Sequence, residues 1–185
     1  MPRAQAPELD RRPIMDELKK LIREVPDFPK AGINFYDITT LLCDSQGFRD
    51  TVDAIAAPYM GEDIDQVIGI ESRGFILGAA VANALGCGFV PVRKPGKLPG
   101  ATHKEAYSLE YGDNALEIHQ DACANQQRIL IVDDVLATGG TAKATIDLAR
   151  KAGGKIIGIS FLIELDFLNG RSKLAGEPAY SVLRY

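Results

Sequence analysis

The chain has 185 residues, 25 of them acidic and 21 basic, which gives a formal net charge of −4. This length predicts one domain, or one domain with a small appendage, and 46% hydrophobic against 25% charged residues excludes wholesale disorder. The acidic balance argues against general nucleic-acid binding, which needs a basic face. A local cluster of Lys and Arg can still bind a small polyanion inside an acidic protein.

Cysteine usage and hydropathy restrict the class further. The three cysteines are widely spaced and form no CxxC pair, so neither a disulfide framework nor a zinc site is indicated. No apolar run approaches the ~18–20 residues of a membrane span, and the N-terminus lacks an apolar signal region. We therefore expect a soluble protein of a reducing compartment, most simply the cytoplasm, with neither a membrane nor a nucleic acid as partner.

The N-terminal third is predicted to be helical around an irregular segment. Residues 1–12 are polar and contain two prolines, so we expect a flexible tail before a single domain over 13–185. Apolar residues at helical spacing predict a helix from Pro13 to Val25, ended by Pro26. Residues 26–37 are punctuated by Pro and Gly, and helical spacing resumes over 45–59.

From residue 65 onward apolar strands alternate with helices. Strands are expected at 65–70, 88–93, 128–132, 155–163 and 179–183, with helices between the first two and between the third and fourth. Residues 94–105 predict a loop, and alternation over 107–111 and 115–119 predicts a hairpin that turns at 112–114. This pattern is typical of an α/β fold whose doubly wound, mostly parallel sheet is flanked by helices.

Two carboxylates and a glycine turn follow the most apolar strand. Asp133 and Asp134 come directly after it, at the sheet edge where doubly wound folds bind ligands, and Thr138–Thr141 opens a helix. Glycine leaves backbone N–H groups unobstructed, and a helix start favours anions. The spacing suggests a ribose 5-phosphate, with its hydroxyls on the acids and its phosphate on residues 137–141. A helix-capping role for the acids is the less favoured alternative.

A second junction, like the one at 133–141, is predicted to connect a strand to a helix through a short turn. Glu71–Gly74 follows a short strand, and Arg73 there could donate two hydrogen bonds to a second anion, although a plain surface arginine is equally compatible. Arg93, Lys94 and Lys97 add three cations within five residues, which could hold a diphosphate or form a solvated loop. Neither a P-loop nor a GxGxxG motif occurs, and Ser72 lacks the first glycine of a GxSxG nucleophile elbow.

Five segments in order resemble the type I phosphoribosyltransferases, and within them the adenine phosphoribosyltransferases. The resemblance covers residues 14–185 and is carried by the segments 26–38, 70–75, 93–100, 107–112 and 133–141. It implies the type I phosphoribosyltransferase fold, with a small hood from about 26–40 and 163–185 and a mobile β-hairpin loop. It also implies a homodimer that acts in purine salvage, transferring the 5-phosphoribosyl group of 5-phospho-α-D-ribose 1-diphosphate to adenine and releasing AMP and pyrophosphate.

The resemblance assigns roles to individual residues. The sugar phosphate is expected on Asp133, Asp134, Ala137, Thr138, Gly139, Gly140 and Thr141, and the diphosphate on Ser72, Arg73, Arg93, Lys94 and Lys97. Arg73 would also help catalysis by neutralising the leaving group. Mg²⁺ is expected mainly on substrate oxygens, with no direct protein ligand.

The base is expected between the hood and the hairpin. Phe35 and Leu165 would sandwich adenine, with its edge read near Asn34 and Tyr36. Glu110, on the closing loop with Tyr111, would take the proton that adenine loses. Asn34 and Tyr36 depart from the family, whose members commonly carry an apolar residue and an arginine there.

Two other functions fit parts of the pattern. A phosphoribosyltransferase for a 6-oxopurine would need a donor to O6, and no lysine occurs near 163–165 to supply it. A non-catalytic phosphoribosyl-diphosphate sensor would need a DNA-binding module or a basic face, for which a 12-residue tail and a net charge of −4 are poorly suited.

Overall fold

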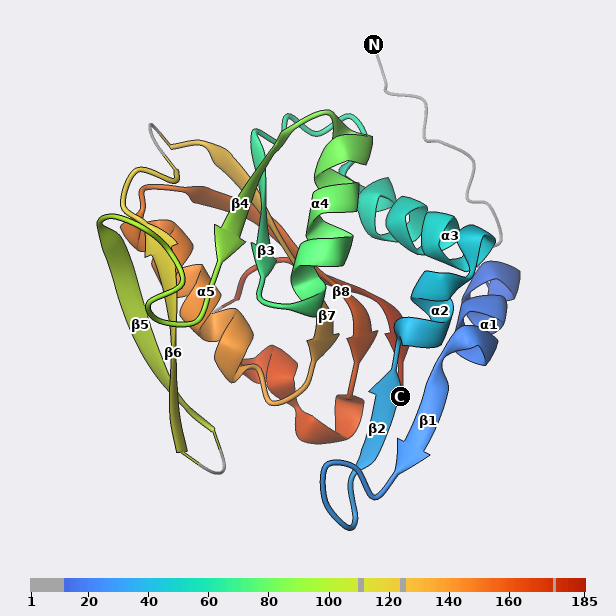
Figure 1. Ribbon diagram of the computed structural model, residues 1–185. Helices are drawn as coiled ribbons and strands as arrows, with labels where there is room; N and C mark the ends of the chain where they lie inside the picture. Colours follow the sequence, from blue (N-terminus) through green and yellow to red (C-terminus); the bar gives the residue numbers. More distant parts are fainter. Residues whose placement is uncertain (1–11, 110–111, 124–125, 175) are drawn as a thin grey trace. The chain divides into compact units, whose positions relative to one another are not determined.

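The computed structural model describes residues 12–109, 112–123, 126–174 and 176–185 (Figure 1). The chain divides into two compact units, one ending at Thr51 and the other beginning at Val52. No helix in these described ranges is long and apolar enough to cross a membrane.

The first unit is a strand pair between helices. Its elements are α1 (Arg12–Leu21), β1 (Arg23–Pro26), β2 (Asn34–Asp37), α2 (Thr39–Cys43) and the first part of α3 (Ser45–Ala56). Leu18, Ile38 and Leu41 are buried apolar side chains of this unit. The Thr40 hydroxyl donates to the Leu21 carbonyl at 2.6 Å, which ties α2 to the end of α1.

The predicted helix from Pro13 to Val25 is too long. It ends at Leu21, and the residues that follow form β1, antiparallel to β2, with Val25 opposite Phe35. The Arg23 guanidinium lies 2.5 Å from Asp37 Oδ2 across this pair. Strand pairing and this ion pair, both made with residues distant in sequence, override the local helical periodicity.

The second unit carries the main sheet. After the short 3₁₀ turn η1 (Ala57–Tyr59), its elements are β3 (Gln66–Ile70), α4 (Arg73–Leu85), β4 (Gly88–Val92), β5 (Thr102–Leu109), β6 (Gly112–His119), β7 (Arg128–Leu136), α5 (Gly140–Lys151), β8 (Lys155–Glu164), η2 (Asp166–Leu168), η3 (Gly170–Lys173) and β9 (Ala179–Arg184). The strand order is β4-β3-β7-β8-β9, and every neighbouring pair is parallel.

A buried parallel sheet explains the continuous apolar strands. Ile129, Leu130, Ile131 and Val132 of β7 are all fully buried, because helices cover both faces of such a sheet. The chain leaves β3 toward β4 and leaves β7 in the opposite direction toward β8, so right-handed connections place α4 and α5 on opposite faces. The predicted doubly wound α/β fold is confirmed.

Strands β5 and β6 form a separate two-stranded sheet that packs on α5 (Figure 1). Their antiparallel ladder runs from Thr102 opposite His119 to Leu109 opposite Gly112. The predicted turn at 112–114 and the predicted loop over 102–105 are therefore wrong. Eight consecutive strand pairs outweigh the local turn preference of Gly, Asp and Asn.

The centre of the sheet should dominate stability. Phe161 of β8 is fully buried, so Phe161→Ala is expected to lower the free energy of unfolding by about 3–5 kcal/mol. Phe167→Ala is the matched control, because that ring is 71% exposed and its loss should change stability by less than about 0.5 kcal/mol. Urea unfolding followed by circular dichroism measures both, and equal losses would contradict this view of the core.

Candidate active site

The candidate site lies where the sheet reverses its winding direction. Strands β3 and β7 are neighbours in parallel register, with Gly69 opposite Val132, and their chains then leave in opposite directions. In open α/β sheets ligands bind outside the carboxyl ends of the strands at such a point. The two predicted anion-binding turns, one after each strand, therefore meet at a single position.

Two adjacent carboxylates are buried at this position. Asp133 is 8% exposed and Asp134 6% exposed, although both are charged residues. Burial raises the pKa of Asp133 well above its ordinary value, and the neighbouring carboxylate of Asp134 raises it further. Burial also raises the pKa of Asp134, while the Arg73 guanidinium opposes that effect.

Arg73 joins the two turns. Its Nε lies 2.7 Å from Asp134 Oδ2, so the first residue of α4 pairs with an acid of β7. Next to it, a Cβ on Gly74 would lie 2.6 Å from Asp133 Oδ1, closer than such atoms approach. A glycine is therefore needed here for the start of α4 to reach the end of β7.

The glycine turn has the geometry of an anion cradle. Gly139 has a φ of +78°, a left-handed conformation that glycine adopts without strain, and α5 begins at Gly140. No side chain in the described part of the chain caps α5 through a hydrogen bond, so its first amides are available to a ligand. The residues predicted to bind the 5-phosphate, 137–141, form this turn.

The cationic loop is folded around a second ion pair. Arg93 Nε lies 3.1 Å from Glu71 Oε2, and the same oxygen accepts the Lys94 backbone N–H at 3.1 Å. The Arg93 guanidinium also donates to the Lys97 carbonyl at 3.1 Å, while the side chains of Lys94 and Lys97 are exposed. These contacts with Arg93 and Lys94 lower the pKa of Glu71, although burial acts against them.

Strand β6 anchors the far side of this loop. Glu117 exchanges two backbone hydrogen bonds with Arg93, and its carboxylate accepts the Gly96 N–H at 3.0 Å. His119 Nε2 lies 2.7 Å from the Pro99 carbonyl. The sequence reasoning missed Glu71 and Glu117 as partners of the loop, although Glu71 stands directly before Ser72 in the second turn. Ser72 itself is exposed, at the N-cap of α4.

The predicted base-binding residues fall in different units. Asn34, Phe35 and Tyr36 are consecutive on β2 of the first unit, where Asn34 Nδ2 donates to Glu24 at 2.8 Å. The Phe35 and Phe28 rings pack edge to face, with 5.1 Å between their centroids. Leu165 belongs to the second unit, so the sandwich of adenine between Phe35 and Leu165 stays a prediction.

Glu110 and Tyr111 lie outside the described residues, so their predicted roles stay predictions as well.

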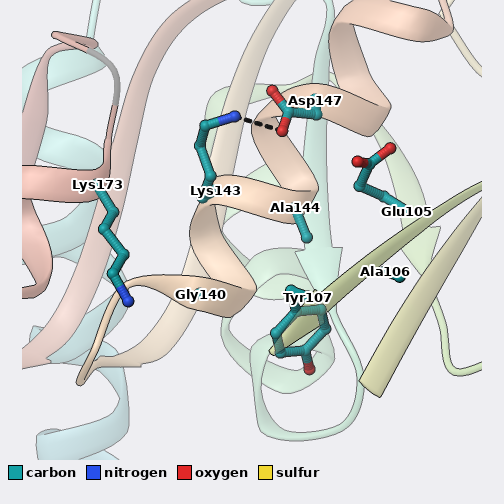
Figure 2. A pocket seen from close by; sticks show the side chains of 8 residues that line it. All are labelled: Glu105, Ala106, Tyr107, Gly140, Lys143, Ala144, Asp147 and Lys173. Carbon is teal, nitrogen blue, oxygen red and sulfur yellow. Dashed lines mark hydrogen bonds and ion pairs between the residues drawn. The ribbon is translucent and has the colours of Figure 1, made fainter. Parts of the chain in front are cut away.

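A cavity of about 260 Å³ opens beside α5, between this helix and β5 (Figure 2). Of the residues predicted for phosphate binding only Gly140 lines it, and Lys143, on the same helix, pairs with Asp147. Figure 2 shows Lys173 extending from η3 toward the start of α5. The cavity is thus a neighbour of the glycine turn rather than the predicted sugar site.

The buried acid pair predicts a specific pH dependence of stability. Because folding raises the pKa of Asp133, its contribution is favourable below its unfolded pKa of about 4 and is lost as the pH rises through the folded value. Asp133→Asn removes the buried charge, so it should raise the melting temperature at pH 8, by about 2–4 °C for each kcal/mol gained. The gain should shrink as the pH falls toward 4.

Asp134→Asn is the matched control for this prediction. It leaves the Arg73 guanidinium without its buried counter-charge, so no gain at pH 8 is expected. Thermal melts of the three proteins across pH 4–8 would contradict the prediction if Asp133→Asn lost stability as much as Asp134→Asn.

Comparison with known proteins agrees with this geometry. A family model described as a phosphoribosyl transferase domain matches residues 42–180. An adenine phosphoribosyltransferase of Koribacter versatilis is 55% identical over 173 residues, which cover 94% of this chain and 95% of the relative. The crystal structure of the Rhodothermus marinus adenine phosphoribosyltransferase superposes with a TM-score of 0.89 at 50% identity, covering 94% of this chain and 99% of that one.

A third relative carries ligands in its crystal. The adenine phosphoribosyltransferase of Saccharomyces cerevisiae, complexed with an imino-altritol bisphosphate and adenine, has a TM-score of 0.88 at 40% identity and covers 93% of this chain and 99% of its own. The resemblance inferred from five sequence segments is confirmed, and the chain belongs to the adenine phosphoribosyltransferase family.

Proposed function

We infer that this protein transfers the 5-phosphoribosyl group of 5-phospho-α-D-ribose 1-diphosphate to adenine, giving AMP and pyrophosphate. The observation that carries this function is the junction of β3 and β7, where a glycine turn, two buried carboxylates and Arg73 meet. The relatives at 50% identity and above are named for the same reaction, and the yeast relative is complexed with adenine. The reaction belongs to purine salvage.

The sugar phosphate would span the β7–α5 connection. The amides of Ala137–Thr141 and the hydroxyls of Thr138 and Thr141 bind the 5-phosphate at the start of α5. Asp133 and Asp134 precede this turn and accept hydrogen bonds from the ribose hydroxyls. The phosphate is thereby kept apart from carboxylates that would repel it.

The diphosphate would lie between the β3–α4 turn and the loop after β4. Ser72, Arg73, Arg93, Lys94 and Lys97 supply its donors and cations. Arg73 and Arg93 are each held by an acid, Asp134 and Glu71, at 2.7 and 3.1 Å. Both guanidiniums are thus oriented before substrate arrives, and they neutralise the negative charge that develops on the leaving diphosphate.

Mg²⁺ is proposed as the metal of the reaction. In the described part of the chain no group of three or more His, Cys, Asp or Glu is arranged to hold a metal, whereas Asp133 and Asp134 supply oxygen donors at the sugar end. Mg²⁺ retains water and binds phosphate oxygens readily, so it would be held mainly by oxygens of the substrate, whose ribose hydroxyls lie on these two acids. When bound, it would neutralise charge on the diphosphate.

The base would be placed by the hood and deprotonated from the hairpin. Phe35 and Leu165 hold the adenine ring between them, and the backbone near Asn34 and Tyr36 reads its edge. Glu110 takes the proton, while Tyr111 belongs to the same closing loop, which excludes water. A cytoplasmic homodimer completes the proposal, on the resemblance alone.

Base selection tests the function directly. With phosphoribosyl diphosphate and Mg²⁺, the protein should form AMP and pyrophosphate from adenine, with kcat/KM at least about 10²-fold above that for guanine, hypoxanthine or xanthine. Pyrophosphate release measured with each base decides the matter. Turnover of 6-oxopurines alone, or tight binding of phosphoribosyl diphosphate without turnover of any base, would overturn the proposed function.

Glu110→Ala should separate catalysis from binding. Loss of a general base is expected to lower kcat by a factor on the order of 10²–10⁴ while the affinity for phosphoribosyl diphosphate stays unchanged. The matched control is Glu105→Ala on the same hairpin, whose carboxylate pairs with Lys151 on α5, and it should retain turnover. Steady-state kinetics and titration calorimetry measure the two quantities, and equal turnover in both variants would remove Glu110 from the mechanism.

A further inference from the structure

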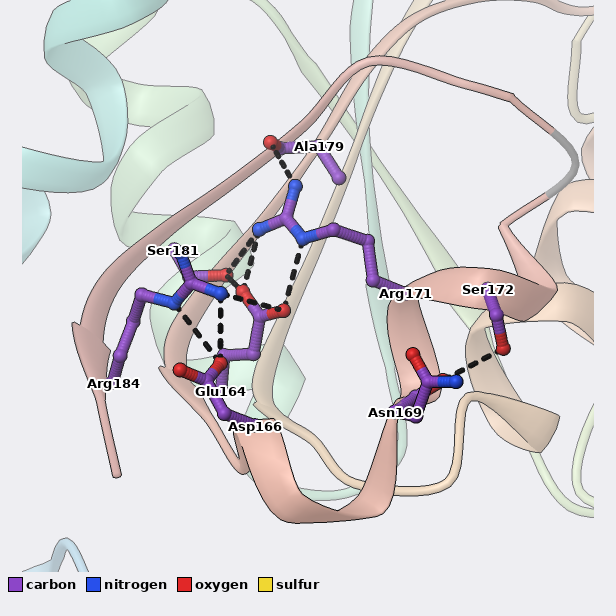
Figure 3. Close-up of polar contacts among 8 residues, drawn as sticks. All are labelled: Glu164, Asp166, Asn169, Arg171, Ser172, Ala179, Ser181 and Arg184. Atoms are coloured by element: carbon purple, nitrogen blue, oxygen red, sulfur yellow. Dashed lines mark hydrogen bonds and ion pairs between the residues drawn. The ribbon is translucent and has the colours of Figure 1, made fainter.

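A buried carboxylate outside the proposed chemistry ends β8. Glu164 is only 4% exposed, and the Arg171 guanidinium binds both of its oxygens, at 2.9 Å from Nε and 2.5 Å from a terminal nitrogen (Figure 3). The Ser181 hydroxyl donates to the same carboxylate at 2.7 Å. These hydrogen bonds, that from Arg171 above all, lower the pKa of Glu164 and keep it ionised.

This ion pair fixes the segment between β8 and β9. Arg171 belongs to η3, and the third nitrogen of its guanidinium donates to the Ala179 carbonyl of β9 at 2.7 Å. One side chain therefore ties the short helix to two strands of the sheet. The Glu164 carboxylate is buried although the Arg171 side chain is partly exposed, and a bidentate arginine–carboxylate pair holds its geometry better than a pair joined by one hydrogen bond.

The fixed segment packs directly against the glycine turn. A Cβ added to Gly170 would collide with the Ala137 carbonyl oxygen and lie 3.0 Å from the Gly139 nitrogen. A Cβ added to Gly139 would in turn collide with the Gly170 carbonyl. The two backbones meet with no room for a side chain, so the position of Gly170 determines where the turn can lie.

Leu165 is held by different contacts. Its N–H donates to the Leu136 carbonyl at 3.0 Å, and the neighbouring Asp166 N–H donates to Tyr185 at 2.9 Å. Both are backbone hydrogen bonds that do not involve the Glu164 carboxylate. A substitution of Arg171 should therefore displace the turn 137–141 more than it displaces Leu165, the residue expected to contact the base.

We propose that Arg171 and Glu164 are positioning residues for the 5-phosphate turn, acting through the backbone contact of Gly170 with Ala137 and Gly139. The proposal rests on the proposed function only in taking that turn as the site of the sugar phosphate. It assigns to an ion pair with a buried carboxylate, remote from the reacting atoms, control over the affinity for phosphoribosyl diphosphate.

Three substitutions and one control test the proposal. Arg171→Ala removes the tie, Arg171→Lys keeps its charge but not its two-pronged geometry, and Gly170→Ala disturbs the contact while leaving the ion pair in place. Ser172→Ala is the control in the same short helix, since the Ser172 hydroxyl donates to the nearby Asn169 carbonyl at 2.7 Å, within the same segment. Circular dichroism first establishes which variants are folded at the assay temperature.

The substitutions are expected to change the affinity for phosphoribosyl diphosphate selectively. Arg171→Ala and Gly170→Ala should each raise KM for phosphoribosyl diphosphate about tenfold or more, since small displacements of a binding group are costly, with kcat and KM for adenine changed less than about threefold. Arg171→Lys should recover part of the loss, and Ser172→Ala should match the wild type. Calorimetric titration with ribose 5-phosphate, which lacks the diphosphate, should show the same order of affinities.

Each result decides the matter. Folded variants with unchanged KM for phosphoribosyl diphosphate, or with both KM values raised equally, would overturn the positioning role. If Arg171→Ala fails to fold, Arg171→Lys and Gly170→Ala carry the same test. If the wild type forms no AMP, the proposed function fails, whereas the ribose 5-phosphate titrations still decide whether the ion pair positions the turn.

Discussion

The winding reversal between β3 and β7 is the constraint on which the candidate site depends. Two parallel strands end side by side, and the chain leaves them in opposite directions, so two helix starts face one position. The close approach of Gly74 to Asp133 and the 2.7 Å pair of Arg73 with Asp134 both follow from this arrangement. Neither junction alone could bring carboxylates, a guanidinium and open helix amides together.

Charge pairing explains how an acidic protein can present a site for a polyanion. Arg73 and Arg93 are each matched by a carboxylate, and Lys94 and Lys97 remain exposed. Burying Asp133 and Asp134 is unfavourable, as their raised pKa values indicate. Residues retained at such a cost to stability are typical of functional sites, where chemistry and not folding selects the side chain.

The local sequence pattern predicted the strands that are buried along their whole length. It failed for residues whose secondary structure is determined by pairing with a distant strand. The apolar runs of β3, β7 and β8 and the turns that follow them could be read directly, because burial of a parallel strand leaves a continuous record in sequence. Val25 keeps helical spacing yet lies in a strand, since its partner Phe35 is ten residues away. Gly112 has turn propensity but pairs with Leu109, because the register is set along the whole β5–β6 ladder.

The contact of Gly139 with Gly170 could not be predicted from the sequence, for a different reason. Each glycine by itself indicates only a turn, and 31 positions separate them in sequence. Both glycines are necessary because their two backbones meet where no Cβ fits. That contact depends on the segment between β8 and β9, which the hydrogen bonds of Arg171 to Glu164 hold in place. The shape of the glycine turn is therefore a property of the assembled sheet, and the motif 137–141 specifies the chemistry of that turn without specifying its position.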